Sequence, residues 1–175
     1  MLYLLDANVL ITAKDSYYSL DTVPEYWEYW EWLEHMARQG QVKIPVEIFE
    51  EIKEGPKKVD ADLLYAWIQQ THVRKALVLD EAVDVALVQE VVNKGYAPDL
   101  TDDQVEEIGR DAFLIAYAMA SPGRCVVTAE VSKPKLQRQN RRVPDVCDAF
   151  GVKRCGPFEF NRALGFRTSW KSGLK

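Results

Sequence analysis

Histidine is almost absent from this chain, and His35 and His72, its only two, lie far apart in the sequence. The chain therefore has too few histidines to favour a histidine-rich metal site or a Ser-His-Asp triad. The three cysteines, Cys125, Cys147 and Cys155, lack Cys-x-x-Cys spacing, which argues against a disulfide framework or a structural zinc site. We interpret the histidines as helix-surface residues and the cysteines as buried thiols.

The sequence also lacks a long hydrophobic run and a glycine-rich phosphate loop. Its apolar start is interrupted by Asp6 and ends by Lys14, so neither a signal peptide nor a membrane span fits, and a cytoplasmic location is expected. No Gly-x-Gly-x-x-Gly motif follows the first predicted strand, which disfavours a dinucleotide-binding enzyme. The 175 residues, of which 47% are hydrophobic and 28% charged, predict one globular domain.

A surplus of positive charge is missing too. The net charge is -5, whereas nucleic-acid-binding proteins are usually basic. The charges are unevenly distributed, however, because the segment from Val131 to Val143 contains cations and no acid. The cations of this segment are Lys133, Lys135, Arg138, Arg141 and Arg142. This cationic segment is either a solvated loop or a surface that binds the phosphate backbone of RNA.

The chain does contain short apolar runs that alternate with longer helical patterns. Strands are predicted at residues 2–5, 42–44, 76–79, 125–127 and 152–154. Helices are predicted at residues 22–38, 45–54, 59–70, 81–93, 101–120, 144–150 and 158–164. This alternation predicts an α/β fold in which helices cover a central parallel sheet. We expect residues 1–165 to form the domain and residues 166–175 to form a C-terminal tail.

The helix predicted to begin at a capping box on Thr22 and to end at Gly40 is unusually aromatic. Its aromatic residues are too widely spread for a single core face, and they are Tyr26, Trp27, Tyr29, Trp30 and Trp32. Core packing is expected to take about two of the three tryptophans. The remaining side chains would form a protein interface or a platform for stacked bases.

Four acids are placed where the fold would bring them together. Asp6 follows the first strand and Glu130 follows the strand at 125–127, and the carboxyl ends of parallel strands meet at one edge of a sheet. Asp111 lies beside the apolar stripe of the helix at 101–120, and Glu51 lies closest to the apolar arc of the helix at 45–54. Helix capping, an ion pair or plain exposure would explain each acid alone. Such explanations are less satisfactory for all four together.

Four carboxylates without matching buried cations would repel one another and lose hydration, and a divalent cation removes that conflict. Ligation by oxygen alone favours Mg²⁺ or Mn²⁺ over zinc, and substrate phosphates commonly complete such sites. The chemistry predicted for the site is hydrolysis of a phosphodiester, in which the metal lowers the pKa of the attacking water. The cationic segment would then hold the nucleic-acid backbone.

These motifs resemble those of the PIN domain nuclease superfamily. The segments that carry the resemblance are Leu5-Asp6-Ala7-Asn8, Phe49-Glu50-Glu51-Ile52, Gly109-Arg110-Asp111-Ala112 and Val127-Thr128-Ala129-Glu130. The opening residues, the aromatic helix and the Val-Pro-Asp-Val-Cys motif at 143–147 are similar to one bacterial and archaeal branch of PIN-like proteins. The resemblance extends to about Gly165.

The resemblance implies a flavodoxin-like, three-layer α/β/α sandwich with Mg²⁺- or Mn²⁺-dependent endoribonuclease activity on RNA. For VapC-like members it also implies the toxin of a type II toxin-antitoxin system, with a cognate antitoxin protein as partner. The residues that would be catalytic and hold metal are Asp6, Glu51, Asp111 and Glu130. Asn8 and Thr128 would support them. Many relatives have Asp at the position of Glu130, and Asp145 is a possible substitute or a helix cap.

Two other interpretations compete with a nuclease. Haloacid-dehalogenase-like phosphatases also have an Asp after the first strand, but they need a second Asp two residues later, where this chain has Asn8. A PIN-fold module that binds RNA or protein with little catalysis is the stronger competitor. The four acids argue against it, and the aromatic helix and low basicity argue for it. A homodimer through exposed aromatic residues is also reasonable.

Overall fold

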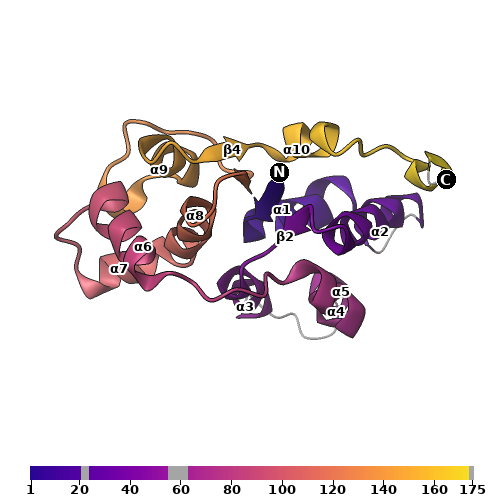
Figure 1. Cartoon of the computed structure of the whole chain (residues 1–175), viewed down its shortest axis with the longest axis horizontal. Coiled ribbons are helices and arrows are strands. Elements are labelled where there is room, and N and C mark those ends of the chain that lie inside the picture. The colour runs from indigo at the N-terminus through magenta and orange to yellow at the C-terminus, as the bar shows by residue number, and fades with distance from the viewer. Residues whose placement is uncertain (21–23, 55–62, 174–175) are drawn as a thin grey trace.

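The computed structural model describes residues 1–20, 24–54 and 63–173, and within them a four-stranded sheet forms the centre of the fold (Figure 1). Its strands are β1 (Leu2–Leu5), β2 (Val42–Lys43), β3 (Arg124–Val127) and β4 (Lys153–Cys155). They are ordered β2-β1-β3-β4, and every neighbouring pair is parallel. This arrangement confirms the predicted α/β class with a central parallel sheet.

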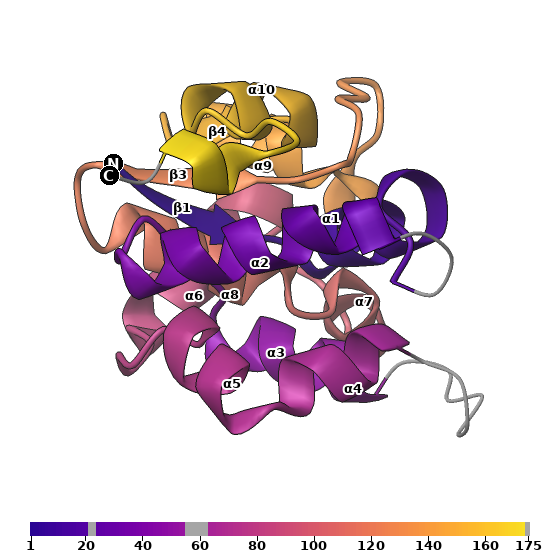
Figure 2. The same ribbon diagram turned by 90° about the vertical axis from the view of Figure 1, so that its right-hand side faces the viewer.

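Helices surround the sheet in both views (Figures 1 and 2). They are α1 (Ala7–Thr12), α2 (Pro24–Arg38), α3 (Val46–Glu54), α4 (Leu63–Gln69), α5 (Thr71–Leu77), α6 (Val85–Glu90), α7 (Asp102–Ile108), α8 (Asp111–Met119), α9 (Val143–Ala149) and α10 (Pro157–Ala163). The π-helical segments η1 (Ala13–Tyr17) and η2 (Val91–Tyr96) continue α1 and α6, and 3-10 turns occupy η3 (Arg138–Asn140) and η4 (Trp170–Gly173). Figure 1 shows α8 and α9 on one side of β1 and α2 and α10 on the other.

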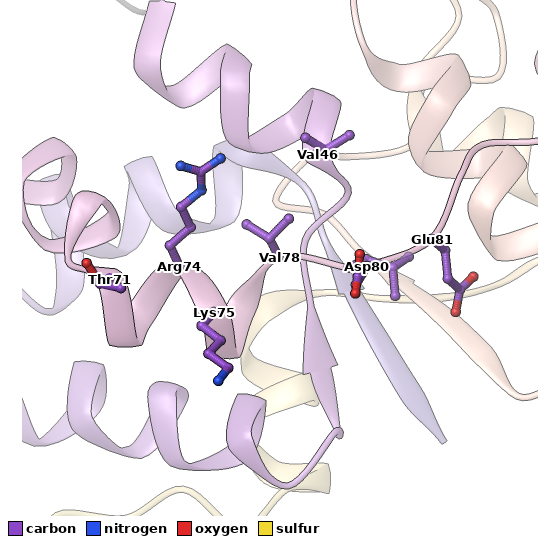
Figure 3. A pocket seen from close by; sticks show the side chains of 8 residues that line it. Val46, Thr71, Arg74, Lys75, Val78, Asp80 and Glu81 are labelled. Atoms are coloured by element: carbon purple, nitrogen blue, oxygen red, sulfur yellow. The ribbon is translucent and has the colours of Figure 1, made fainter.

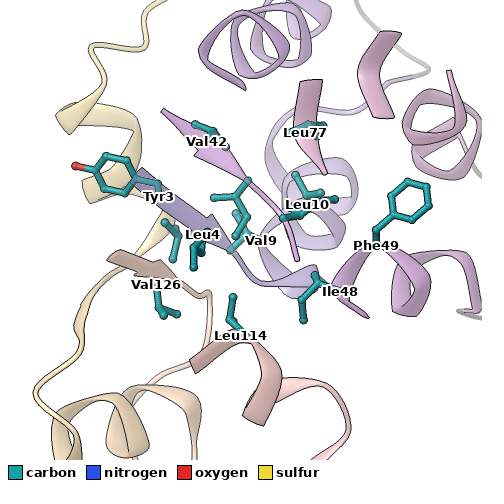
Figure 4. Close-up of a cluster of buried hydrophobic side chains, with 14 of the residues drawn as sticks. Tyr3, Leu4, Val9, Leu10, Val42, Ile48, Phe49, Leu77, Leu114 and Val126 are labelled. Carbon is teal, nitrogen blue, oxygen red and sulfur yellow. The ribbon is translucent and has the colours of Figure 1, made fainter. Parts of the chain in front are cut away.

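The core is centred on β1, which pairs with a strand on each side. Leu4 and Leu5 are fully buried, as expected for a parallel strand that is covered by helices on both faces. The Tyr3 ring meets Phe160 of α10 edge-on at a centroid distance of 5.3 Å. Leu4 lies near Leu114 of α8 (Figure 4). Successive residues of β1 therefore anchor helices on opposite faces of the sheet.

Two predictions between residues 76 and 84 were wrong, and the first failed because a short apolar run does not distinguish a strand from the end of a helix. The strand predicted at 76–79 is mostly the last turn of α5, and only Val78 forms an isolated bridge, with Ile44. The helix predicted from residue 81 begins later. Asp84 caps it by accepting hydrogen bonds from the backbone N–H groups of Ala86 and Leu87, so α6 starts at Val85.

The helix predicted over 101–120 is two helices. Its capping box is confirmed, since Thr101 and Gln104 exchange side-chain and backbone hydrogen bonds. The helix then breaks at Gly109, whose φ of +63° lies in the left-handed region that favours glycine. Asp111 consequently opens α8 instead of lying inside a longer helix. The capping box predicted at Thr22 and the start of the helix predicted at 59–70 lie outside the described residues.

Two of the three tryptophans of α2 belong to the core, as predicted. Trp30 and Trp32 are 1% and 0% exposed, whereas Trp27 is 55% exposed. Residues beyond 165 pack against the same helix. Phe166 contacts the Trp32 ring at a centroid distance of 4.8 Å, and the Trp170 indole donates a hydrogen bond to the Glu28 carbonyl. The division of the chain at residue 165 stays a prediction.

The described cysteines form no disulfide, and Cys125 and Cys147 are buried. Cys155 is half-buried, and its sulfur lies 3.8 Å from that of Cys125. None of the helices in the described part of the chain has the length and hydrophobicity needed to cross a membrane.

Candidate active site

The predicted site begins where β1 and β3 end side by side. Leu5 pairs with Val127, so Asp6 and Thr128 follow at the same edge of the sheet. The Thr128 hydroxyl donates a hydrogen bond to Asp6 Oδ2 at 2.7 Å, and the Asn8 side-chain amide donates to the same oxygen at 2.5 Å. Among the described residues, Asp6 Oδ1 receives only the backbone N–H of Asn8, at 3.5 Å. One carboxylate oxygen of Asp6 is thus held firmly, and the other is almost free.

Asn8 and Thr128 also brace the chain that leads to Glu130. The Asn8 side-chain oxygen accepts a hydrogen bond from the Ala129 N–H at 2.8 Å. The Thr128 hydroxyl accepts one from the Glu130 N–H at 3.1 Å. Both side chains therefore link the ends of β1 and β3, which is the supporting position that the sequence predicts for them.

Asp111 enters the same region from the first turn of α8. No described residue donates a hydrogen bond to its carboxylate or forms an ion pair with it. Burial raises the pKa of Asp111 well above its usual value, and the charges of Asp6, Glu130 and Glu51 raise it further against the opposing effect of Arg142. Asp111 is therefore surrounded by acids with little compensation.

The other acids show the same mutual repulsion. Burial raises the pKa of Asp6 to about 6, with a further contribution from Glu130, although hydrogen bonds from Thr128 and Asn8 oppose the change. The pKa of Glu51 is also raised, by partial loss of hydration on the side toward the protein and then by the charge of Asp6, against the opposing effect of Arg110. The charges of four acids therefore act on one another, and we call these acids the acid cluster: Asp6, Glu51, Asp111 and Glu130.

Of the four acids of α3, only Glu51 is directed toward this cluster. Glu50 pairs with Lys53 at 2.5 Å, and Glu54 pairs with Arg110 at 3.4 Å. The charge of Glu47 acts on Tyr117 instead. The side chain of Glu51 is exposed, so it approaches the acid cluster from its solvent side. The choice of Glu51 from its helical angle therefore agrees with the electrostatics.

Glu130 makes structural contacts with both of its carboxylate oxygens. Its Oε1 accepts a hydrogen bond from the Arg142 guanidinium at 3.0 Å, and its Oε2 accepts one from the Val143 N–H at 2.8 Å. Both carboxylate oxygens therefore attach the end of β3 to the first turn of α9. The charge of Glu130 still acts on Asp6 and Asp111.

Asp145, the possible substitute for Glu130, is directed elsewhere. Its carboxylate accepts hydrogen bonds from the Ser132 hydroxyl and, at 2.8 Å, from the Lys133 N–H. Its charge is not among those that shift the pKa of Asp6 or Asp111. Arg142 occupies the N-cap position of α9, so Asp145 does not cap that helix. Asp145 instead anchors the start of the cationic segment.

The acid cluster fits a hard divalent cation in ligand type and charge, because its donors are oxygens, Asp6 Oδ1 is almost free and the Asp111 carboxylate has no described partner. In spacing it is not a ready-made site. Across residues 1–20, 24–54 and 63–173, no group of three or more His, Cys, Asp and Glu side chains is arranged to hold a metal ion. Repulsion between like charges and the attachment of Glu130 to Arg142 both favour this separation.

Comparison with known proteins places the chain in a family. Residues 3–168 match the model of a family described as a domain of unknown function, DUF4411. The chain belongs to this family. No curated protein matches it. The acid cluster, from Asp6 to Glu130, lies entirely within the matched part of the DUF4411 domain.

The cationic segment of the DUF4411 domain divides into two groups. Its arginines hold the fold: Arg138 pairs with Asp99 at 2.7 Å, Arg141 donates to backbone carbonyls, and Arg142 pairs with Glu130. Lys133 and Lys135 are exposed, and no described acid pairs with either. The predicted RNA contacts are untested, but only the two lysines have free side chains for them.

Tyr96 is a buried residue with an unpaired hydroxyl that the sequence did not reveal. It ends η2, is 6% exposed, and its hydroxyl has no hydrogen-bond partner among the described residues. Burial raises the pKa of Tyr96, and so do the nearby charges of Asp111, Glu130 and Asp6. The phenol is therefore a buried, unpaired group that responds to the charges of the acid cluster. The sequence offered only Gly95 as a helix end, and no local pattern marks the tyrosine.

A pocket of about 490 Å³ lies away from the acid cluster, beside α5 and the start of α3 (Figure 3). It is lined by Val46, Thr71, Arg74, Lys75, Val78, Leu79, Asp80 and Glu81. None of the four clustered acids lines it. The candidate active site of the DUF4411 domain is therefore defined by its charges and hydrogen bonds, and this pocket does not contribute to it.

Proposed function

We propose that this DUF4411 domain is a PIN-like endoribonuclease that hydrolyses RNA phosphodiester bonds with Mg²⁺ or Mn²⁺. The observation that supports the proposal is the incomplete compensation of charge in the acid cluster. Asp6, Glu51 and Asp111 each have a pKa that is raised in part by a neighbouring acid, and the Asp111 carboxylate has no described hydrogen-bond partner. Such repulsion costs stability in the absence of a ligand, and a divalent cation offsets it.

The fold is compatible with this proposal. The parallel sheet and its order place the ends of β1 and β3 together, as the arrangement of acids in PIN nucleases requires. Each of the four resembling segments contributes one acid to the cluster. Because ligands of α/β sheets bind outside the carboxyl ends of the strands, this edge is also where a substrate would be expected.

Within the proposed site, Asp6 and Asp111 are the principal metal ligands, with Glu51 and Glu130 adding negative charge. Thr128 and Asn8 keep Asp6 in one orientation by holding its Oδ2, which leaves Oδ1 for the metal. A bound metal would neutralise charge on the scissile phosphate and lower the pKa of the attacking water.

Binding of the RNA backbone falls to the two unpaired lysines of the cationic segment. Lys133 follows directly on the chain that Asp145 anchors, and Lys135 is also exposed. Each would bind phosphate as a mobile point charge.

We further propose that the domain is the toxin of a type II toxin-antitoxin pair. The exposed face of α2, where Tyr26 and Trp27 are 40% and 55% exposed, is a candidate surface for the antitoxin or for a second copy of the chain. Aromatic residues of this kind are common at the centres of protein interfaces. Co-purification of the chain with the product of a neighbouring gene would test this part of the proposal.

The central experiment is cleavage of a mixed RNA substrate by the purified protein with Mn²⁺ or Mg²⁺. The variants Asp6→Asn and Asp111→Asn, and EDTA with the parent, should each reduce the rate about 100-fold or more, because metal catalysis contributes several kcal/mol to the barrier. Asp148→Asn is the matched control, since Asp148 is exposed and pairs with Arg154 outside the cluster. Full activity in Asp6→Asn or Asp111→Asn would show that the site is wrongly assigned.

A PIN-fold module that binds RNA or protein without cleavage is the second candidate. It is favoured by one observation, namely that both oxygens of Glu130 are already occupied by Arg142 and Val143. The same experiment separates the two functions. A parent protein that binds RNA but leaves it intact with either metal would support the binding module over the nuclease.

A further inference from the structure

Two cysteines contact each other across the neighbouring strands β3 and β4. In the parallel register Cys125 pairs with Lys153, two residues before Cys155. Because side chains alternate along a strand, residues two apart share a face, so both thiols lie on the same face of the sheet. Their sulfurs are 3.8 Å apart and hydrogen-bond to each other. We call Cys125 and Cys155 the thiol pair.

The thiol pair lies beside a pocket of about 430 Å³. Both cysteines line this pocket, together with Lys153, Glu159 and Arg162. Cys125 is 4% exposed and Cys155 is half-buried, so the pocket is the route by which a small molecule would reach the two sulfurs. None of the residues of the acid cluster lines the pocket. The thiol pair therefore forms a separate site.

The thiols of the chain differ in acidity. The hydrogen bond with Cys155 lowers the pKa of Cys125, and the charge of Lys153 lowers it further, although burial opposes both effects. The same hydrogen bond and burial raise the pKa of Cys155. Burial raises the pKa of Cys147 in α9 to about 12. Because the thiolate is the reactive form of cysteine, Cys125 is the most reactive of the three, and Cys155 is a protonated neighbour within reach of it.

We propose that the thiol pair is a modification site, at which a peroxide converts Cys125 and Cys155 into a reversible disulfide. The Cys125 sulfur attacks one oxygen of hydrogen peroxide and becomes a sulfenic acid, and the other oxygen leaves as water. The Cys155 sulfur then attacks the Cys125 sulfur, a second water leaves, and the disulfide remains. In total, the two thiols lose two hydrogen atoms, and one peroxide accepts them to give two molecules of water.

The position of β4 allows this bond to form. The two sulfurs must approach from 3.8 Å to about 2 Å, which requires a small movement of one strand or both. Strand β4 has three residues, lies at the edge of the described sheet and pairs there only with β3, so it can shift more readily than a central strand. The Cys155 carbonyl also accepts a hydrogen bond from the Thr128 N–H at 3.2 Å. Oxidation would therefore act directly on the residue that orients Asp6.

The test is treatment of the purified protein with hydrogen peroxide, followed by alkylation of the remaining thiols and peptide mass mapping. The parent should give a peptide pair joined through Cys125 and Cys155, and dithiothreitol should restore both thiols. Cys147 should be oxidised about 100-fold more slowly or less, because burial suppresses its thiolate. Cys147→Ala is the matched control, and it should form the disulfide at the rate of the parent.

Two further variants assign the function of each sulfur. Cys155→Ser should accumulate the sulfenic acid of Cys125, which dimedone labels, because no second thiol is left to attack it. Cys125→Ser should react with peroxide about tenfold more slowly than the parent or slower still, because Cys155 keeps its proton. Equal reaction rates in Cys125→Ser and the parent would overturn the assignment of Cys125 as the attacking thiol.

The outcomes are independent of the proposed nuclease function, since the measurement is of a covalent bond and requires neither metal nor RNA. A parent that keeps both thiols after peroxide treatment would overturn the inference, and so would one that joins Cys125 or Cys155 to Cys147 or to a second copy of the chain. Either result would leave the proposed nuclease in place. A parent that forms the disulfide but does not cleave RNA would overturn the proposed function alone.

Discussion

The acid cluster and an aromatic cluster made of Tyr18, Tyr29, Trp32, Phe160 and Phe166 differ in whether the contacts between their members attract or repel. Tyr18 stacks on Tyr29 at a centroid distance of 4.0 Å, and Phe166 meets Tyr29 edge-on at 5.2 Å. These are favourable aromatic geometries. The acid cluster, by contrast, gathers like charges with little compensation. The aromatic cluster stabilises the fold, whereas repulsion within the acid cluster destabilises it. Local destabilisation of this kind is expected of binding sites.

The largest expected effect is loss of the aromatic cluster. Trp32 is fully buried, so Trp32→Ala should lower the free energy of unfolding by about 3–5 kcal/mol. Denaturant unfolding followed by circular dichroism would measure the change. Trp27→Ala is the control from the same helix, because Trp27 is 55% exposed, and it should cost about 1 kcal/mol or less. Equal costs for the two variants would contradict the division of α2 into a buried and an exposed face.

Because of the acid cluster, the free energy of unfolding of the metal-free protein should fall as pH rises. The pKa of Asp6 is raised from 3.8 to about 6, so the folded state binds the proton more tightly than the unfolded state does. The contribution of Asp6 to the free energy of unfolding is fully present below the pKa of the unfolded state. It is lost as pH rises through about 6, and the loss amounts to about 3 kcal/mol. Urea unfolding of the metal-free protein between about pH 4 and about pH 7 would measure it.

Two controls sharpen the pH prediction. Asp6→Asn should reduce the slope, because the variant has no carboxyl group to titrate at that position. Mn²⁺ should also flatten it, since the metal binds the ionised carboxylates and competes with protons. If the free energy of unfolding of the metal-free parent rises between about pH 4 and about pH 6, the raised pKa of Asp6 is contradicted.

The smallest expected effect concerns the cationic segment at the edge of the acid cluster. Replacing Lys133 and Lys135 by alanine should weaken the salt dependence of RNA binding. The slope of log association constant against log salt concentration should become smaller by about 1.4 for single-stranded RNA, because each lysine neutralises one phosphate. Fluorescence anisotropy at several salt concentrations measures this slope. Lys171→Ala is the control, since Lys171 pairs with Glu31 near the aromatic cluster. An unchanged slope in the lysine variant would leave the segment with a structural function only.

The parts of the fold and site that depend on local pattern could be predicted from the sequence. The apolar runs at β1 and β3 are short, and each is followed by polar residues, so the meeting of Asp6 and Thr128 follows from the parallel pairing. The choice of Glu51 followed from helical periodicity, because its angle on α3 sets its direction. In each case, neighbouring residues determine where the side chain lies.

The parts that depend on distant contacts could not be predicted. The apolar stripe of α7 continues into α8, so periodicity alone predicted one helix and missed the break at Gly109. Glu130 is tied to Arg142 across a loop, and no spacing rule relates the two residues. Tyr96 is buried beside Gly95, which packs closely on α9 across a long stretch of sequence. These features belong to tertiary packing, which overrides local preference.

The central position of β1 has a consequence for the order of folding during synthesis. Leu2 pairs with Arg124, so the first strand lacks one neighbour until more than two thirds of the chain has been translated. At typical elongation rates this delay is on the order of ten seconds. Asp6 therefore leaves the ribosome long before Asp111 and Glu130 can join it. The topology therefore delays assembly of the acid cluster until Glu130 has been translated.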